Sequence, residues 1–281
     1  MRGIIVERAI VVGCGYVGKA VAATWVQRGL DVTVTTTRVE RLAELEAIAP
    51  HAIVLRADQP EALKEAIANQ DTVLLSIGAP NRNAYEETYL NTAKSLVSII
   101  NETSVQQVIY TGSCAIYGDQ SGQPVDEETA IAPITPQHQI LAETENTLMN
   151  ASRQGSAICI LRLGGIYGPG RSLLRIFGRA AGTTRPGDGS EPSNWSHLDD
   201  IVEGIDFART HRLNGRYNLV QPDPPSRREL IGQVCQMHNL PPVQWDSTQP
   251  GTRSYNAVVL NQKITGEGYT FIHKTFCAQD T

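Results

Sequence analysis

Short apolar runs alternate with amphipathic stretches over the first 165 residues of the chain. Such runs are typical of strands that are buried on both faces of a parallel sheet. They predict strands at 9–13, 32–35, 52–55, 72–76, 107–111 and 157–161. Apolar residues at helical spacing predict helices at 17–27, 40–48, 60–68, 85–101 and 137–152. Strands that alternate with helices in this way predict an α/β fold, a Rossmann-type doubly wound parallel sheet.

The pattern changes after Leu163. Two segments rich in glycine and proline are predicted to be loops, at 164–171 and 182–194. Weaker signals predict helices at 199–209 and 227–238 with a strand at 216–220 between them, and the tail 240–281 is irregular. We therefore expect a Rossmann domain in residues 1–165, completed by the strand near 216–220, and a smaller C-terminal lobe in residues 166–281 that is interleaved with this core.

Composition and charge exclude several classes of protein. The chain has 281 residues, 29 acidic and 24 basic, with a net charge of -5 and no basic patch, so we expect no nucleic-acid partner. No apolar run approaches the roughly 20 residues that span a bilayer, and the first eight residues do not form a signal peptide. The five cysteines include no C-x-x-C pair, which predicts reduced thiols in the cytoplasm and no metal site.

A glycine-rich turn, Gly13-Cys-Gly15-Tyr-Val-Gly18, joins the first predicted strand to the first predicted helix. This is the context that a dinucleotide-binding G-x-G-x-x-G requires. Gly13 allows the tight turn, Gly15 leaves room for a pyrophosphate, and Gly18 lets the helix pack closely on the strand. The helix N-terminus then offers N–H groups and a partial positive charge to the phosphates.

The end of the second strand indicates which dinucleotide binds. An NAD site has an acid there for the ribose 2′-hydroxyl, but this chain has Thr35-Thr36-Thr37-Arg38. Hydroxyls and a guanidinium suit a 2′-phosphate, so NADP is favoured over NAD; the alternative is that Arg38 is merely solvated. Asp58 either accepts from the adenine amino group or caps the helix that begins near Pro60. The cofactor contacts that we expect are Gly13, Gly15, Tyr16, Val17, Gly18, Thr36, Thr37, Arg38, Asp58, Ser76 and Gly78.

Four further segments resemble the extended short-chain dehydrogenases/reductases, which are NAD-dependent epimerase/dehydratase-like proteins, and in particular their atypical YeeZ-type branch. They are Thr111-Gly-Ser113-Cys-Ala-Ile-Tyr117-Gly118, Leu161-Arg162 with Gly165-Ile-Tyr167-Gly-Pro-Gly170, His197-Leu-Asp199-Asp200, and Tyr217-Asn218. The resemblance spans about residues 8–270. It implies a substrate-binding function for the smaller lobe, a strand near 216–220 that returns to the main sheet, a nucleotide-linked substrate and a homodimer. It also implies that Ser113 orients the substrate.

The chain departs from the family at the residues that usually transfer the proton. In the family, the Tyr that transfers the proton is followed four residues later by a Lys. Alignment on Ala132–Pro136 places Gln137 and Leu141 at these two positions. None of the nine tyrosines has a lysine four residues later, so the departure does not depend on the alignment. Neither an amide nor an aliphatic side chain can act as an acid at neutral pH.

Three residues are candidates for the catalytic role that the family's Tyr–Lys pair would otherwise have. Ser113 and Tyr117 are the catalytic candidates, and His138, which adjoins the vacant position and titrates near neutrality, is a weaker one. For Tyr117 the alternative is packing within its loop, and for His138 it is exposure to solvent on its helix. Four arginines are expected to hold a phosphorylated substrate or, alternatively, to form a solvated face; they are Arg171, Arg175, Arg179 and Arg185.

The sequence leaves two functions open. The first is an NADP(H)-dependent oxidoreductase or epimerase with an atypical acid–base group, acting on a small-molecule substrate. The second is a catalytically silent NADP(H)-binding sensor or protein-interaction module. The full-length lobe favours the first function, and Gln137 and Leu141 favour the second.

Overall fold

The computed structural model describes all residues except 1–5, 153–154, 252, 254 and 277–281. The chain divides into two compact units, and each unit is assembled from three separate segments. The first unit comprises Met1–Gly112, Pro136–Leu161 and Val202–Arg216. The second comprises Ser113–Thr135, Arg162–Ile201 and Tyr217–Thr281. The chain therefore passes between the units several times.

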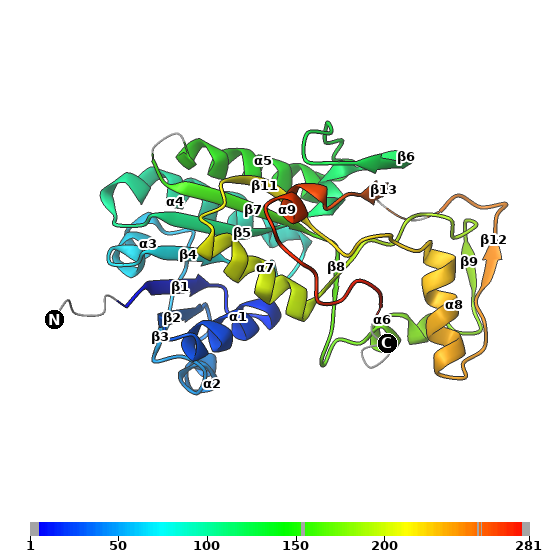
Figure 1. The fold of residues 1–281 in the computed structure, drawn as a ribbon, viewed down its shortest axis with the longest axis horizontal. Coiled ribbons are helices and arrows are strands. Elements are labelled where there is room, and N and C mark those ends of the chain that lie inside the picture. The colour runs from blue at the N-terminus through cyan, green and yellow to red at the C-terminus, as the bar shows by residue number, and fades with distance from the viewer. Residues whose placement is uncertain (1–5, 153–154, 252, 254, 277–281) are drawn as a thin grey trace. The chain divides into compact units, whose positions relative to one another are not determined.

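A seven-stranded sheet with the order β11-β7-β5-β4-β1-β2-β3 forms the framework (Figure 1). Its parallel strands are β1 (Arg8–Val12), β2 (Asp31–Thr36), β3 (His51–Val54), β4 (Thr72–Leu75), β5 (Gln107–Ser113), β7 (Ala157–Leu163) and β11 (Gly215–Leu219). Ala9 of β1 lies opposite both Val32 and Thr72, so β1 occupies the centre where the strand order reverses. This confirms the predicted doubly wound α/β fold, and the late strand β11 forms one edge of the sheet.

Helices cover both faces of the sheet (Figure 1). On one face lie α3 (Pro60–Ile67), α4 (Thr92–Ile99) and α5 (Pro136–Ser152); on the other lie α1 (Tyr16–Gln27), α2 (Leu42–Glu46) and α7 (Leu198–Thr210). Buried side chains such as Leu63 of α3, Leu96 of α4 and Leu148 of α5 pack with Ile10 and Tyr110 of the strands. The long helix expected at 85–101 is interrupted: a π-helical segment, Glu86–Asn91, precedes α4 and a 3-10 turn follows it.

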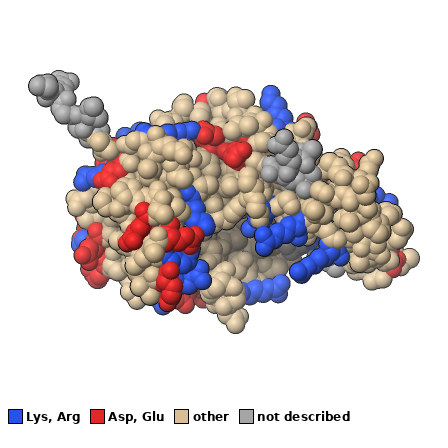
Figure 2. Space-filling view, turned by 90° about the horizontal axis from the view of Figure 1, so that it is seen from below, with Lys and Arg blue, Asp and Glu red and all other residues tan. Residues whose placement is uncertain are grey.

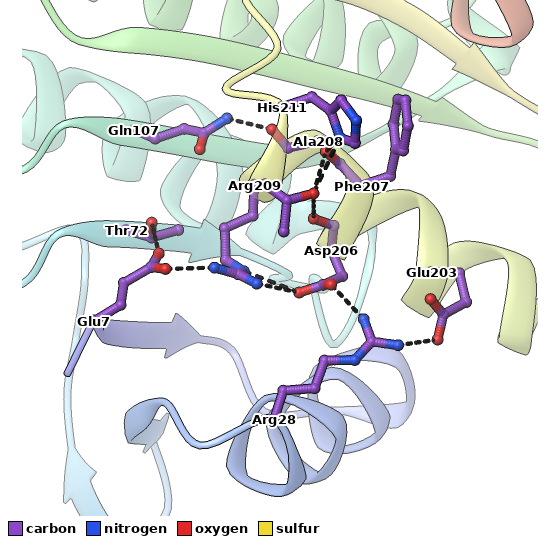
Figure 3. A network of polar contacts seen from close by, with 11 residues as sticks. Glu7, Arg28, Thr72, Gln107, Glu203, Asp206, Phe207, Ala208, Arg209 and His211 are labelled. Atoms are coloured by element: carbon purple, nitrogen blue, oxygen red, sulfur yellow. Dashed lines mark hydrogen bonds and ion pairs between the residues drawn. The ribbon is translucent and has the colours of Figure 1, made fainter. Parts of the chain in front are cut away.

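A network of ion pairs joins α7 to α1 and to the start of β1 (Figure 3). The Asp206 carboxylate accepts hydrogen bonds from Arg28, which directly follows α1, and, at 2.9 Å, from Nε of Arg209 one turn further along α7. Arg28 also pairs with Glu203 at 2.5 Å, and Arg209 pairs with Glu7. Asp206 is buried, so the two guanidinium groups neutralise a carboxylate that is shielded from water.

The second unit contains short elements that the sequence pattern does not reveal. Three two-stranded parallel pairs join β6 (Asp119–Val125) to β13 (Asn256–Val259), β8 (Gly165–Tyr167) to β10 (Trp195–His197), and β9 (Thr184–Pro186) to β12 (Gln244–Asp246). Helix α8 (Arg227–Met237) confirms the helix expected at 227–238, whereas α6 (Leu173–Phe177) and α9 (Gln262–Gly266) lie where the pattern predicts no helix. The only buried side chain of β6 is Val125, so an apolar pattern does not mark this strand.

The charged surface of the first unit is made largely of opposite charges in contact. Figure 2 shows acidic and basic side chains side by side toward the end of the molecule where the chain begins. Within this unit Lys64 pairs with Glu102, and Arg56 with Asp58 at 3.1 Å. In the part of the chain that the structure describes, no helix combines the length and the apolar character needed to cross a membrane.

Candidate functional site

The glycine-rich turn lies at the carboxyl end of β1, where neighbouring crossovers diverge to opposite faces of the sheet. Such a switch point is where open α/β sheets bind their ligands. The backbone N–H of Gly13 donates to Oγ1 of Thr35 at 3.1 Å, and that of Cys14 donates to the Thr35 carbonyl at 3.0 Å. The turn is thereby fastened to β2, and α1 begins with its first N–H groups directly behind it.

The three glycines of the turn have different surroundings. Gly13 has φ +87°, and a Cβ there would lie 2.7 Å from the carbonyl oxygen of Ser76. A Cβ on Gly18 would lie 2.6 Å from the Gly13 carbonyl oxygen. Around Gly15, in contrast, nothing lies within 4 Å of the position that a Cβ would take, and Gly15 is exposed. Gly13 and Gly18 are therefore required by packing, whereas Gly15 leaves open space in front of a helix N-terminus. This arrangement fits a dinucleotide pyrophosphate.

The end of β2 carries hydroxyls and no acid. Thr36 is buried, and its Oγ1 accepts a hydrogen bond of 3.1 Å from the Arg38 backbone N–H, which shapes the turn that follows. Thr37 and Arg38 are exposed beyond it.

Sequence reasoning missed Arg41, which reaches back over the glycine-rich turn. Its Nη2 donates to the Cys14 carbonyl at 3.0 Å, and its Nε donates to Glu44 at 3.1 Å. Glu44 also pairs with Lys19 of α1 at 2.8 Å, and the bonds from Lys19 and Arg41 lower the pKa of the Glu44 carboxyl to about 2. Two cations, Arg41 and Lys19, and one acid, Glu44, therefore act on Cys14 in the turn, so this corner of the site retains a positive charge.

The other expected cofactor residues lie in the same unit. Tyr16 and Val17 begin α1, and Ser76 and Gly78 follow β4, with the Ser76 backbone N–H bonded to the Val12 carbonyl at 2.9 Å.

Asp58, also in this unit, does not cap the helix that follows it. It pairs with Arg56, and the residue at the N-cap of α3 is Gln59, which makes no side-chain cap. The alternative in which Asp58 caps this helix is therefore wrong.

The second unit contains a cavity of about 480 Å³ with Ser113 in its wall. Ser113 is half-buried, and its Oγ accepts a hydrogen bond of 3.2 Å from the Ala115 N–H, which starts the 3-10 turn Cys114–Tyr117. This bond uses a lone pair of the Ser113 oxygen and not the hydroxyl hydrogen, so the hydroxyl can still donate to a substrate. Phe177 and Trp195 supply aromatic surface to the same cavity.

Two arginines, Arg227 and Arg253, line this cavity. Arg253 donates to the hydroxyl of Tyr255 at 2.7 Å and lies over its ring. Burial lowers the pKa of Arg227, and the charges of Arg185 and Arg253 lower it further, with Glu191 as an opposing acid. Of the four arginines proposed from sequence, Arg185 thus belongs to this positive cluster. Arg175 instead bonds the carbonyl of Gly170 at 3.0 Å.

Tyr117 is not in the wall of the cavity. It is fully buried, and its hydroxyl donates to Oδ1 of Asn218 at 2.9 Å and accepts from Nη1 of Arg162 at 2.8 Å. Burial raises the pKa of Tyr117 to about 12 despite the Arg162 charge. A phenol in this setting ties together three segments of the second unit, so the structure favours the packing alternative over the catalytic one.

Helix α5 carries the residues aligned with the family's proton-transfer pair. Gln137 and His138 are half-buried, and burial lowers the pKa of the His138 imidazole. Leu141 is buried. One turn further on, the buried Glu145 lies 3.4 Å from Nε of Arg216 of β11, an ion pair that fastens the helix to the edge strand.

The segment His197–Asp200 anchors the C-terminal part of the chain. Nδ1 of His197 accepts from the Asp199 N–H at 3.1 Å, so the histidine, and not Asp199, satisfies a backbone donor at the start of α7. The buried Asp200 accepts from the N–H groups of Ile272 at 2.6 Å and His273 at 3.2 Å. His197, Asp200 and His273 are close enough together for metal ligands. Because the Asp200 oxygens already accept backbone bonds, we assign the cluster a structural role.

Comparison with known proteins agrees with this geometry. The model of the NAD dependent epimerase/dehydratase family matches residues 9–219. The chain is 29% identical to Protein YeeZ of Escherichia coli (strain K12) over 245 residues, which cover 85% of this chain and 86% of that protein.

Solved structures of enzymes share the fold. The UDP-glucose 4-epimerase of Thermus thermophilus in complex with NAD has a TM-score of 0.76 and 20% identity, covering 94% of each chain. The dTDP-glucose 4,6-dehydratase of Bacillus anthracis str. Ames in complex with NAD has a TM-score of 0.78 and 17% identity, covering 93% of this chain and 90% of that one. The glycine-rich turn, the doubly wound sheet and the family match together lead to one conclusion: the chain belongs to the NAD dependent epimerase/dehydratase family.

Proposed function

We propose that the protein is an NADP(H)-dependent oxidoreductase or epimerase that acts on a small, phosphate-bearing substrate. The observation that carries the proposal is the open space at Gly15, bordered by the Arg41 guanidinium and by a β2 end without an acid. Arg can grip a phosphate through two N–H groups at once, whereas an NAD site needs a carboxylate for the 2′-hydroxyl. The expected cofactor contacts named above, together with Arg41 and Lys19, would hold the dinucleotide.

The bound nicotinamide would supply or accept a hydride, and the protein's own groups would hold the substrate. Ser113 would donate a hydrogen bond to the substrate oxygen from the cavity wall. Burial raises the pKa of Cys114 to about 11 and raises that of Tyr255 still further, so neither titrates near neutrality. We therefore propose that a water molecule, polarised by Ser113, takes over the proton transfer that the family assigns to its Tyr–Lys pair.

The substrate class follows from the charge of the cavity. Arg227 and Arg253 converge there, and Arg185 adds to their potential. Guanidinium groups that repel one another in a partly buried site are stabilised by an anion, and a phosphate or diphosphate fits their fork-shaped donors. The solved relatives act on UDP-glucose and dTDP-glucose by their descriptions, so a sugar nucleotide is the substrate class that we propose.

Calorimetric titration tests the cofactor. We expect NADPH to bind more tightly than NADH, and Arg41→Gln to weaken NADPH binding about tenfold to a hundredfold, because a charge-assisted hydrogen bond contributes about 1.5–3 kcal/mol. NADH affinity should change little. Lys64→Gln, which removes an exposed cation of α3, serves as the control. Equal affinities for the two cofactors, unaffected by Arg41→Gln, would reject the NADP assignment.

A pair of hydroxyl deletions separates catalysis from folding. Ser113→Ala should lower turnover per folded molecule, and it should also lower the free energy of unfolding by about 0.5–2 kcal/mol, because its Oγ caps the Ala115 N–H. Tyr117→Phe should lower the free energy of unfolding by about 1–3 kcal/mol, because Asn218 loses its buried donor and Arg162 an acceptor. Turnover per folded molecule should persist in Tyr117→Phe. Loss of that turnover at unchanged stability would make Tyr117 the proton donor after all.

A catalytically silent NADP(H)-binding sensor is the second candidate function. Gln137 and Leu141 support it, because these side chains cannot transfer protons. Both candidates require NADPH binding, but the sensor predicts no hydride transfer to any sugar nucleotide. A turnover of about 1 s⁻¹ or more with one such substrate, followed by the absorbance of NADPH, rules the sensor out.

A further inference from the structure

The two arginines of the Ser113 cavity are held in different ways. Arg253 donates hydrogen bonds to the Pro192 carbonyl at 2.6 Å and to the Tyr255 hydroxyl at 2.7 Å. Arg227 is half-buried, and no residue that the structure describes makes a hydrogen bond or an ion pair with its guanidinium. An arginine side chain can adopt many rotamers, so Arg227 needs another contact to keep its charge beside the cavity.

This contact is with the indole of Trp245 on β12. The Cζ atom of Arg227 lies over the Trp245 ring, 5.9 Å from its centroid, and the Cζ atom of Arg228 lies 5.8 Å from it. Both distances fall within the range of about 6 Å in which an aromatic face attracts a guanidinium. Arg228 is exposed and donates from Nε to the Asp188 carbonyl at 2.7 Å. The two arginines therefore share one ring, and Arg227 is the one of the two that lines the cavity.

Trp245 itself is fixed by strand pairing and by close packing. In the parallel pair of β9 and β12 it lies opposite Arg185. The backbone of Gly189 packs directly against its ring, since a Cβ at Gly189 would lie 2.8 Å from the Cε2 and Cζ2 atoms of the indole. The Gly189 carbonyl in turn accepts a hydrogen bond of 2.8 Å from the backbone N–H of Arg228 in α8. The ring is thus held in place beside the helix that begins with Arg227.

An aromatic ring holds a guanidinium differently from a carboxylate. A carboxylate accepts hydrogen bonds from the same planar fork of N–H groups that a phosphate uses. A ring face attracts the positive charge through its quadrupole and leaves the N–H groups in the guanidinium plane free. Burial and the charges of Arg185 and Arg253 disfavour the charged form of Arg227 and lower its pKa. A ring face favours the charged form without competing with an anion.

We propose that Trp245 is a positioning residue of the anion site, which is the part of the Ser113 cavity bordered by Arg227 and Arg253. Its indole holds the Arg227 guanidinium beside the cavity with the N–H groups available to a phosphate. The proposal rests on the proposed function, because it concerns how a phosphate-bearing substrate is held. Trp245 is not in the wall of the cavity and acts through Arg227.

Uridine 5′-diphosphate is the probe, and calorimetric titration of the full chain measures its affinity. Trp245→Met and Trp245→Phe are a matched pair, since both remove part of the indole but only phenylalanine keeps an aromatic face. Trp245→Met should bind the probe about tenfold more weakly than the wild type, and Trp245→Phe should bind it within about threefold of the wild type. Unchanged affinity in Trp245→Met overturns the proposal, and so does an equal loss in the two variants.

A double-mutant cycle separates positioning from general damage to the second unit. Arg227→Gln should weaken binding at least as much as Trp245→Met. Adding Trp245→Met to Arg227→Gln should cause little further loss, because the ring then has no guanidinium to hold. A merely structural role for Trp245 predicts the same loss in both backgrounds, and that result overturns the proposal. Thermal unfolding shows whether each variant is folded, and Trp245→Leu replaces Trp245→Met if the latter is not.

Arg228→Gln is the control, because Arg228 contacts the same ring but does not line the cavity. It should change the affinity less than about twofold, since solvent screens an exposed charge. A loss as large as that of Trp245→Met would mean that the ring does not act through Arg227.

Failure of the proposed function has a different result. The wild type would then show no binding of the probe that Arg227→Gln weakens, which rejects the anion site and the role of Trp245 together. Binding that depends on Arg227 but survives Trp245→Met rejects the role of Trp245 alone.

Discussion

A methyl group at position 15 is expected to abolish dinucleotide binding while leaving the fold intact. Apart from its chain neighbours and the backbone of its own helix, no described residue lies within 4 Å of the new Cβ of Gly15→Ala, and the backbone there, φ -87° and ψ -146°, needs no positive φ. The methyl group would occupy the space in which a pyrophosphate approaches the N–H groups of α1. Loss of two such charge-assisted bonds, at about 1.5–3 kcal/mol each, weakens NADPH binding about a hundredfold or more. Calorimetric titration measures the affinity, and thermal unfolding without cofactor measures the stability.

Gly18→Ala is the matched control for this prediction. Its Cβ would meet the Gly13 carbonyl oxygen at 2.6 Å, so α1 must move away from β1 at a cost of about 1–3 kcal/mol. We thus expect lowered stability at position 18 and unchanged stability at position 15. Normal NADPH affinity in Gly15→Ala would mean that no pyrophosphate passes over this turn.

Asp206→Ala should lower the free energy of unfolding by about 2–3 kcal/mol. The substitution leaves the guanidinium groups of Arg28 and Arg209 facing each other without the carboxylate that both contact (Figure 3). Removing one partner of a buried ion pair costs about 3–5 kcal/mol, and the value here is smaller because Arg28 is 36% exposed and keeps Glu203. Urea denaturation monitored by circular dichroism measures the change.

Two variants control for charge and for exposure. Asp206→Asn keeps one acceptor and removes the charge, so it should lie between the wild type and Asp206→Ala. Glu203→Gln removes a carboxylate that is 38% exposed, and the expected loss is below about 1 kcal/mol. If all three variants are as stable as the wild type, the network contributes nothing to the attachment of α7.

The sequence predicts the first unit well because strands such as β1, β2 and β4 are buried. The runs at 9–13, 32–35 and 72–76 are largely apolar, and β1, β2 and β4 lie within two residues of them. The second unit is different. Its strand β6 alternates between exposed and half-buried residues and includes Gly122 and Pro124, so neither apolar pattern nor strand propensity marks it.

The residues of the candidate site divide in the same way. Gly13, Gly15 and Gly18 act within one turn, so their spacing alone predicts their surroundings. Arg41 reaches Cys14 only because α2 packs beside the turn, and local sequence gives no sign of that contact. The burial of Tyr117 likewise depends on Arg162 and Asn218, which tertiary structure brings to it from far along the chain.

The cavity residues are harder still to foresee. Arg227 and Arg253 lie on separate segments with no motif in common, and only the tertiary structure brings them to one cavity. Residue type and spacing can identify groups that act through their neighbours in sequence. They cannot identify groups whose partners come from distant segments.

The interleaving of the two units has a consequence for synthesis on the ribosome. The sheet of the first unit lacks its edge strand β11 until residues 215–219 have emerged, and β6 has no partner until β13 follows at 256–259. Neither unit can therefore complete its fold during translation of the first half of the chain. A nascent chain halted near residue 165 would expose unpaired strand edges, which are sites of aggregation and of chaperone binding.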